Sequence, residues 1–276
     1  MGKLVMLEME EKNRVTRAAK QMIEIDRLLG VRRAPIAESC SLVGSASSEI
    51  CSVDEVRETE KETEAMVEYA GNNPVRVEKA KRLAELCERH NRECPLVKTM
   101  PGYTNVVFGE GDPNARLMFI GEAPGADEDR LGRPFVGRAG KLLDKMIVAM
   151  GLKREEVYIC NLLKVRPPNN ATPTPEQVDQ SSPFLVEQVG IVEPQVIVAL
   201  GSPCAKFLLQ TKEGITNLRG RWFTPGLLGM SSEINVMPTF HPAYLLRAYT
   251  PENRKKVWSD LCEVMERLGM QVPAAG

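Results

Sequence analysis

Residues 117–125 read LMFIGEAPG, and this stretch decides the fold. The apolar run at residues 117–120 is typical of a buried strand. The loop that follows, at residues 121–125, sets the carboxylate of Glu122 between glycines and a proline. Glycine lets the backbone approach a ligand closely, and proline stiffens a turn. The stretch therefore predicts a buried strand of an α/β protein that ends in a functional loop.

The chain from residue 116 onward alternates short apolar runs with amphipathic segments. The apolar runs predict strands at residues 117–121, 157–163, 196–200 and 236–240. The segments between and after them predict helices at residues 138–150, 175–191, 203–209 and 252–268. Strands that alternate with helices form a parallel sheet covered on both faces. We therefore expect a three-layer α/β/α fold around a central four-stranded parallel sheet.

The first part of the chain has a different character. Residues 8–29 carry apolar side chains at helical spacing, and residues 54–70 are acidic and compatible with a helix. A further helix is predicted at residues 75–92. We therefore divide the chain into a helical N-terminal extension with a loop-rich linker, residues 1–75, and a catalytic domain, residues 76–276.

Overall charge gives no reason to expect a polyanionic partner, because the formal net charge of the 276 residues is −1. The two parts of the chain differ, however. Residues 1–70 carry 10 basic and 14 acidic side chains, whereas residues 71–276 carry 26 basic and 23 acidic ones. Any affinity for nucleic acid must therefore come from local basic patches in the second part.

The seven cysteines are dispersed and contain no Cys-x-x-Cys pair. This pattern is typical of a reducing compartment rather than a disulfide framework. No apolar run approaches the roughly 20 residues that span a bilayer. We therefore expect a cytoplasmic protein without membrane contact, and we take it to be a monomer.

Polar side chains occur at the ends of three predicted strands. Glu122 follows the first strand, Asn161 lies late in the second, and His241 follows the fourth. In open α/β sheets the ligand crevice lies beyond the carboxyl ends of the strands. We therefore expect these side chains to meet in one crevice.

Several long segments resemble the family 4 uracil-DNA glycosylases. They read GEAPGADEDRLGRPFVGRAG (121–140), YICNLLK (158–164) and TFHPAYLLR (239–247), supported by VVFGEGDPNARLMFIGE (106–122) and RKKVWSDL (254–261). The resemblance covers about residues 85–268 and leaves the first 70 or so unmatched. It implies a monofunctional enzyme of base excision repair, which flips uracil out of DNA, hydrolyses its N-glycosidic bond and leaves an abasic site.

The resemblance also implies roles for individual residues. Phe135 would stack on the flipped base, and the Asn161 carboxamide would match the N3–H and O4 of uracil. His241 would donate to uracil O2 as the bond breaks, and Glu122 would orient the attacking water or stabilise positive charge on the sugar. The other residues expected to bind the base are Gly121, Ala123 and Gly125.

The partner implied is uracil-containing DNA, single- or double-stranded. Leu245 is the candidate to fill the space that the flipped base leaves, as apolar wedges do. A position in the core is the alternative for this leucine. The candidate phosphate contacts are Arg133, Arg138, Lys164, Arg166 and Arg247.

Most family 4 enzymes carry a [4Fe–4S] cluster held by four cysteines. The motifs place these ligands at Asn91, Cys94, Val165 and Ser181. Thiolates are the usual ligands of such clusters, and a valine cannot bind iron. The sequence therefore predicts no cofactor and no metal site.

Three other functions stay open. The first is a non-catalytic or covalently trapping binder of uracil-containing DNA with the same fold. Relatives that trap DNA covalently use a histidine in an arginine-rich loop, but residues 215–222 contain no histidine, which disfavours trapping. A glycosylase for another deaminated base, such as hypoxanthine or xanthine, would differ only in pocket width. A small-molecule enzyme or nucleotide-binding module has little support, because GEAPG matches neither glycine-rich phosphate-binding pattern.

Overall fold

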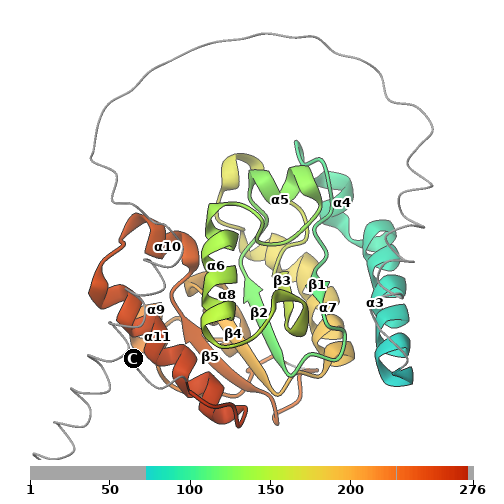
Figure 1. Cartoon of the computed structure of the whole chain (residues 1–276). Coiled ribbons are helices and arrows are strands. Elements are labelled where there is room, and N and C mark those ends of the chain that lie inside the picture. Colours follow the sequence, from blue (N-terminus) through green and yellow to red (C-terminus); the bar gives the residue numbers. More distant parts are fainter. Residues whose placement is uncertain (1–72, 228, 273–276) are drawn as a thin grey trace, which may run out of the picture.

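The structure, a computed structural model, describes residues 73–227 and 229–272 (Figure 1). The helices predicted at residues 8–29 and 54–70 lie outside this part of the chain. Within the described ranges, none of the helices has the length and apolar character needed to cross a membrane.

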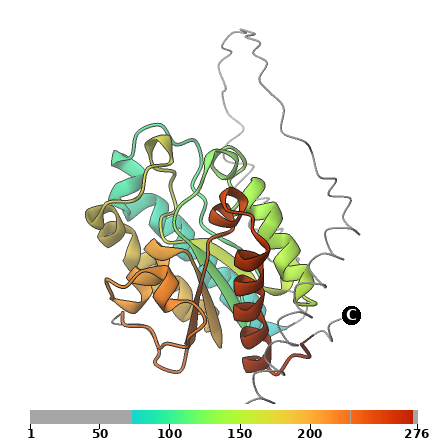
Figure 2. The ribbon, with the colours of Figure 1, turned by 90° about the vertical axis from the view of Figure 1, so that its left-hand side faces the viewer.

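Strands form one central sheet, and helices cover both of its faces (Figures 1 and 2). The strands are β1 (Glu110–Gly111), β2 (Leu117–Gly121), β3 (Tyr158–Asn161), β4 (Val196–Leu200) and β5 (Asn235–Thr239). The longer helices are α3 (Pro74–Glu93), α6 (Arg138–Ala149), α7 (Pro175–Val192), α8 (Ser202–Leu209) and α11 (Pro251–Arg267). The shorter ones are α4 (Pro95–Thr99), α5 (Ala126–Leu131), α9 (Ile215–Leu218), α10 (Pro242–Arg247) and the 3-10 turns η1 (Arg154–Glu156) and η2 (Pro168–Asn170).

The sheet has the strand order β1-β3-β2-β4-β5. Strands β2 to β5 pair in parallel, which confirms the four predicted parallel strands and the α/β fold. The fifth strand, β1, was not predicted. It is two residues long and pairs antiparallel with β3, with Glu110 opposite Ile159. A segment this short carries no periodic pattern of its own.

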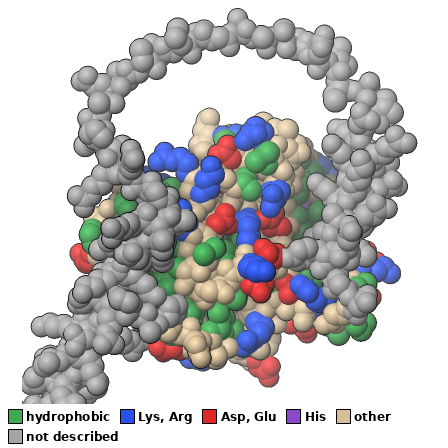
Figure 3. Space-filling model, in the orientation of Figure 1, with side chains coloured by type: hydrophobic (Ala, Val, Ile, Leu, Met, Phe, Trp, Pro, Cys, Tyr) green, Lys and Arg blue, Asp and Glu red, His purple; other side chains and the backbone are tan. Residues whose placement is uncertain are grey.

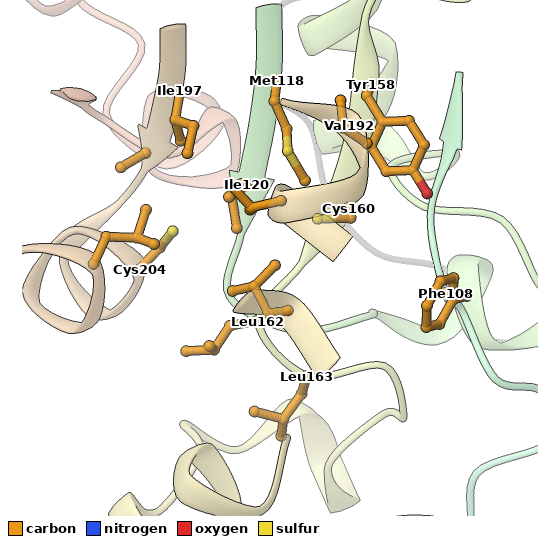
Figure 4. Close-up of a cluster of buried hydrophobic side chains, with 14 of the residues drawn as sticks. Phe108, Met118, Ile120, Tyr158, Cys160, Leu162, Leu163, Val192, Ile197 and Cys204 are labelled. Atoms are coloured by element: carbon orange, nitrogen blue, oxygen red, sulfur yellow. The ribbon is translucent and has the colours of Figure 1, made fainter. Parts of the chain in front are cut away.

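Two apolar cores lie on the two faces of the sheet, and β2 contributes to both. Leu117 and Phe119 belong to the core under α6 and α11. Met118 and Ile120 belong to the core under α3, α7 and α8, part of which Figure 4 shows. Successive side chains of a strand point to opposite faces. Every residue of β2 is therefore buried, and the strand reads as a continuous apolar run.

Helix α3 is attached firmly to the sheet domain. Its first turn is capped by Asn73, whose side chain accepts from the amide of Val75. Further along, Lys79 donates to the carbonyl of Val192 at 3.0 Å and pairs with Glu193 at 2.8 Å. These contacts join the start of α3 to the end of α7.

Candidate active site

A pocket of about 600 Å³ lies at the carboxyl edge of the sheet. Each of the four parallel strands sends a side chain into its lining. Glu122 follows β2, Asn161 ends β3, Ser202 follows β4 and His241 follows β5. Phe135, from the loop before α6, completes the set. The structure thus brings together the three predicted polar residues and the predicted aromatic ring.

The carboxamide of Asn161 is the most unusual group in this pocket. The residue is 1% exposed, and its Oδ1 has no hydrogen-bond partner among the described residues. A Cβ on Gly121 would lie 2.3 Å from this oxygen, so the carboxamide rests directly on glycine backbone. A buried acceptor without a partner costs about 1–3 kcal/mol. The oxygen is therefore placed to receive a hydrogen bond from a ligand.

Phe135 presents its ring to the same space. Its ring lies 5.6 Å from that of His241 in a stacked arrangement. A Cβ on Gly121 would meet the Phe135 ring at 2.6 Å. The absence of a side chain at Gly121 therefore provides the space that the Asn161 carboxamide and the Phe135 ring occupy. Of the other expected base-binding residues, Ala123 and Gly125 do line the pocket.

His241 is fixed as a neutral hydrogen-bond donor. It is the N-cap of α10, and its Nδ1 accepts from the amide of Ala243 at 3.0 Å. Burial, together with the nearby charge of Arg247, lowers the pKa of His241 to about 4. The ring is therefore neutral at pH 7. Because Nδ1 accepts, the proton resides on Nε2.

Two glutamates line the pocket and differ in their partners. The carboxylate of Glu128 accepts from the amides of Val136 at 2.9 Å, Gly137 at 2.8 Å and Gly125 at 3.2 Å. Although Glu128 lies in the first turn of α5, its carboxylate connects the loop at Gly125 to the loop at residues 136–137. Glu122 is half-buried, and burial raises its pKa. Glu122 is therefore the carboxylate best placed to act on a ligand.

Four of the predicted phosphate contacts are fully or partly exposed. Arg247 is exposed and lines the pocket, and Arg138 is exposed at the start of α6. Arg133 is exposed and pairs with Glu110 at 2.8 Å. Arg166 is half-buried. Figure 3 shows basic side chains in the region of α5 and the start of α6, interspersed with acidic ones.

Two predicted DNA contacts are corrected by the structure. Lys164 is 0% exposed, and its Nζ donates to the carbonyl of Asn161 at 2.8 Å and to Gln188. It braces the end of β3 from inside and cannot reach a phosphate. Leu245 is 1% exposed and belongs to the core under α6 and α11. The exposed residue beside it on α10 is Tyr244, which lines the pocket.

Sequence reasoning missed several residues that line the pocket: Asn170, Thr172, Ser202 and Thr216. Ser202 follows β4 after the single residue Gly201, so the rule that located Glu122 and His241 applies to it as well. Asn169 and Asn170 both adopt the left-handed conformation, with φ of 55° and 53°. Two asparagines after two prolines are a turn signal.

The family model described as the uracil DNA glycosylase superfamily matches residues 108–262 of the chain. The chain belongs to this superfamily. The type-4 uracil-DNA glycosylase of Thermotoga maritima is 45% identical over 183 residues, which are 65% of this chain and 91% of that protein. That of Archaeoglobus fulgidus is 42% identical over 186 residues, or 66% and 90% of the two chains.

A more distant relative is the type-5 uracil-DNA glycosylase of Pyrobaculum aerophilum. It is 32% identical over 150 residues, which are 49% of this chain and 64% of that protein. The type-4 relatives thus resemble this glycosylase more closely and over more of their length. The predicted membership of family 4 is confirmed.

The prediction of no cofactor is corrected by this membership. Type-4 uracil-DNA glycosylases are the family known to carry an iron–sulfur cluster, and several of them are similar to this chain. A glycosylase of this family is therefore expected to have a cofactor, contrary to what the sequence alone predicted.

At the four positions that correspond to the cluster ligands of the family, all of them in the described part of the chain, only Cys94 is a cysteine. These side chains therefore do not fit a cluster held by four cysteines. Cys94 is buried, with its Sγ 3.7 Å from the carbonyl of Gln180. Val165 is buried and apolar, and the Ser181 hydroxyl donates to the carbonyl of Leu162 at 2.7 Å. Across the same described ranges, no group of three or more His, Cys, Asp or Glu is arranged to hold a metal.

Proposed function

We propose that this glycosylase excises uracil from DNA by hydrolysing the N-glycosidic bond, which leaves an abasic site. The observation that carries the proposal is the buried Oδ1 of Asn161, which has no partner among the described residues and lies in a pocket beside an aromatic ring. The similarity to type-4 uracil-DNA glycosylases supports the same activity.

Recognition would depend on a base that has left the duplex, because a stacked base cannot enter such a pocket. Uracil N3–H donates to Asn161 Oδ1, and uracil O4 accepts from Nδ2. Cytosine presents a lone pair at N3 and an amine at C4, so the same carboxamide orientation leaves groups without partners. Phe135 supplies a flat surface for the ring of the base.

The chemical step separates charge, and two residues respond to it. As the N1–C1′ bond breaks, its electron pair moves to the uracil ring and charge accumulates on O2. His241 Nε2–H donates to that oxygen and stabilises the anion. The ionised Glu122 stabilises the positive sugar and accepts the proton of the water whose oxygen bonds to C1′.

The partner proposed is uracil-containing DNA, single- or double-stranded, with Arg138 and Arg247 at its phosphates. We propose further that the protein acts as a monomer, since one chain supplies the whole pocket lining. The catalytic domain would be residues 76–276, preceded by the N-terminal extension of residues 1–75.

An assay on oligonucleotides that contain one uracil tests this function. Product is revealed by alkali cleavage at the abasic site, for the wild type and for Glu122→Ala, Asn161→Ala and His241→Ala. We expect wild-type cleavage and a large loss of rate in each variant. Removing the His241 donor should cost about 10²–10³-fold, as for a preorganised oxyanion donor.

Glu85→Ala is the matched control, since Glu85 is an exposed carboxylate on α3, far along the chain from any pocket residue. Its rate should equal that of the wild type. Undiminished product in all three pocket variants would contradict the mechanism. No product from the wild type on single- or double-stranded substrate would contradict the function itself.

A further inference from the structure

The backbone of Phe135 is strained. Its φ is +51°, in the left-handed region that side chains with a Cβ rarely adopt. For such a residue this conformation is energetically unfavourable, because the Cβ approaches the following carbonyl oxygen too closely. It persists only where the surrounding structure holds it in place. The residue proposed to stack on the base therefore needs contacts from its neighbours to keep its backbone in this conformation.

Arg154 contacts this strained residue from outside the pocket. It lies on η1, just before β3, and does not line the pocket. Its guanidinium donates to the carbonyl of Phe135 at 3.3 Å and to that of Pro134. These carbonyls belong to the peptides before and after the Phe135 Cα. Holding both of them fixes φ and ψ of Phe135.

Arg154 is itself oriented by two carboxylates. Its Nε donates to Glu110 at 2.6 Å, and its Nη1 donates to Asp144 at 2.5 Å. The arginine side chain is only 20% exposed, so these bonds are largely shielded from water. A guanidinium presents its donors in a rigid planar fork, which a lysine cannot reproduce. The three elements β1, η1 and α6 are thus joined at one group.

The remaining sides of the Phe135 loop are also occupied. A Cβ on Gly140 would lie 1.8 Å from the Phe135 carbonyl oxygen, so α6 packs directly against it. On the far side of the same peptide, the amide of Val136 donates to Glu128 at 2.9 Å. The peptide between Phe135 and Val136 is therefore held by a cation at its oxygen and by an anion at its nitrogen.

We propose that Arg154 is a positioning residue for base recognition, which keeps Phe135 in its left-handed conformation and so sets the surface on which the flipped base stacks. This inference rests on the proposed function. Arg154 touches neither the base nor the sugar, and its effect on the reaction passes entirely through Phe135.

A double-mutant cycle on the uracil oligonucleotide tests this role. We expect Arg154→Ala to lower kcat/KM on the order of 10²-fold, the cost of misplacing a contact by about an ångström. Phe135→Ala removes the stacking ring. Because Arg154 acts through that ring, adding Arg154→Ala to Phe135→Ala should cause little further loss. Multiplicative losses in the double variant would overturn the proposal.

Two further measurements separate positioning from general stability. Millimolar guanidinium should restore part of the Arg154→Ala rate relative to sodium at equal ionic strength, with no such gain for the wild type. Arg116→Ala is the matched control, because Arg116 also donates to a carbonyl, that of Leu268, outside the pocket lining. It should lose stability without a change in kcat/KM. An equal loss of kcat/KM in Arg116→Ala would overturn the proposal.

A crystal structure of Arg154→Ala, or of Arg154→Lys if the alanine variant does not fold, gives a readout that needs no activity. Phe135 is expected to leave the left-handed region in either variant. An unchanged φ at Phe135 would overturn the inference even if the wild type excises uracil. A wild type that releases no uracil would instead overturn the proposed function.

Discussion

Gly121 shows how a residue without functional groups can control a site. The Asn161 Oδ1 and the Phe135 ring both lie where a side chain at residue 121 would be, at 2.3 and 2.6 Å from an added Cβ. Contacts under 3.0 Å essentially require atoms to move. The carboxamide and the ring can therefore occupy their positions only because residue 121 is a glycine.

We accordingly expect Gly121→Ala to displace both recognition groups and to reduce uracil excision by about 10²-fold or more. The measurement is kcat/KM on the uracil oligonucleotide, with the urea midpoint as a check on folding. Gly190→Ala serves as the control, because an added Cβ there meets nothing within 4 Å. Wild-type activity in a folded Gly121→Ala protein would contradict this account of the site.

His241 illustrates how one hydrogen bond sets the chemistry of a side chain. An ordinary histidine with a pKa near 6.5 is partly protonated at neutral pH. The amide of Ala243 donates to Nδ1, which requires that nitrogen to be unprotonated. Burial works in the same direction and lowers the pKa to about 4. The sequence motif His-Pro-Ala thus supplies a neutral donor through the cap of α10.

At the scale of elements, the carboxyl end of β3 is held to α7 by a buried polar network. Lys164 donates to the carbonyl of Asn161 and to Gln188. Gln188 in turn donates to the carbonyl of Phe108 at 3.1 Å and to the Tyr158 hydroxyl at 2.9 Å. Gln188 and Lys164 are both 0% exposed. Their partners therefore have no water to replace a lost bond.

Gln188→Leu should destabilise the protein by roughly 2–4 kcal/mol, because the buried Lys164 Nζ loses one of its two acceptors and the carbonyl of Phe108 loses the Gln188 donor. Lys164→Met should cost a similar amount. The double variant should cost less than the sum of the two, since each single change already breaks the same network. Urea unfolding monitored by circular dichroism measures all three, and strict additivity would show that the two residues act independently.

Elements buried on both faces were the ones that the sequence predicted best. The bounds of β2 and β4 match the prediction because every one of their residues is apolar. β1 was missed because it exists only through its pairing with β3. Lys164 was misplaced because a lysine prefers the surface, whereas the packing at the end of β3 buries this one. The role of Leu245 as a wedge came from the resemblance, and the structure places this leucine in the core, which was the alternative.

The same limit applies to the site. The rule that ligands bind at the carboxyl ends of parallel strands located Glu122, Asn161 and His241 from sequence, and the structure places all three in one pocket. It could not reveal Arg154, whose partners come from β1, α6 and the loop at Phe135. Such a residue is defined by contacts between distant segments, and no local pattern marks it.

On the scale of the whole molecule, three buried ionisable groups among the described residues have strongly shifted pKa values and make stability respond to pH. Burial lowers the pKa of His90 and of His241 to about 4. Burial raises the pKa of Asp260 to about 6, although Arg219 and Thr239 both bond to it. As the pH falls, the two histidines lower the free energy of unfolding, whereas Asp260 raises it.

Between pH 6.5 and about 4, each of these histidines is protonated in the unfolded chain but remains neutral in the folded protein. Each histidine therefore contributes stability that is complete above pH 6.5 and is lost as the pH falls toward 4, on the order of 3 kcal/mol. Asp260 binds its proton more readily in the folded state than in the unfolded state. Acidification from pH 6 to 4 therefore increases the free energy of unfolding through Asp260, which offsets the loss that one of the two histidines causes.

The variant His90→Phe tests this balance. His90 lies between the rings of Phe108 and Phe184, at 5.8 and 4.9 Å, so an aromatic replacement retains the packing. Once His90 is removed, the stability lost through His241 on acidification is nearly balanced by the stability gained through Asp260. The free energy of unfolding in urea should therefore fall less between pH 7.0 and 4.5 in the variant than in the wild type, by on the order of 3 kcal/mol. An identical fall in both proteins would show that His90 is protonated in the folded state as readily as in the unfolded chain.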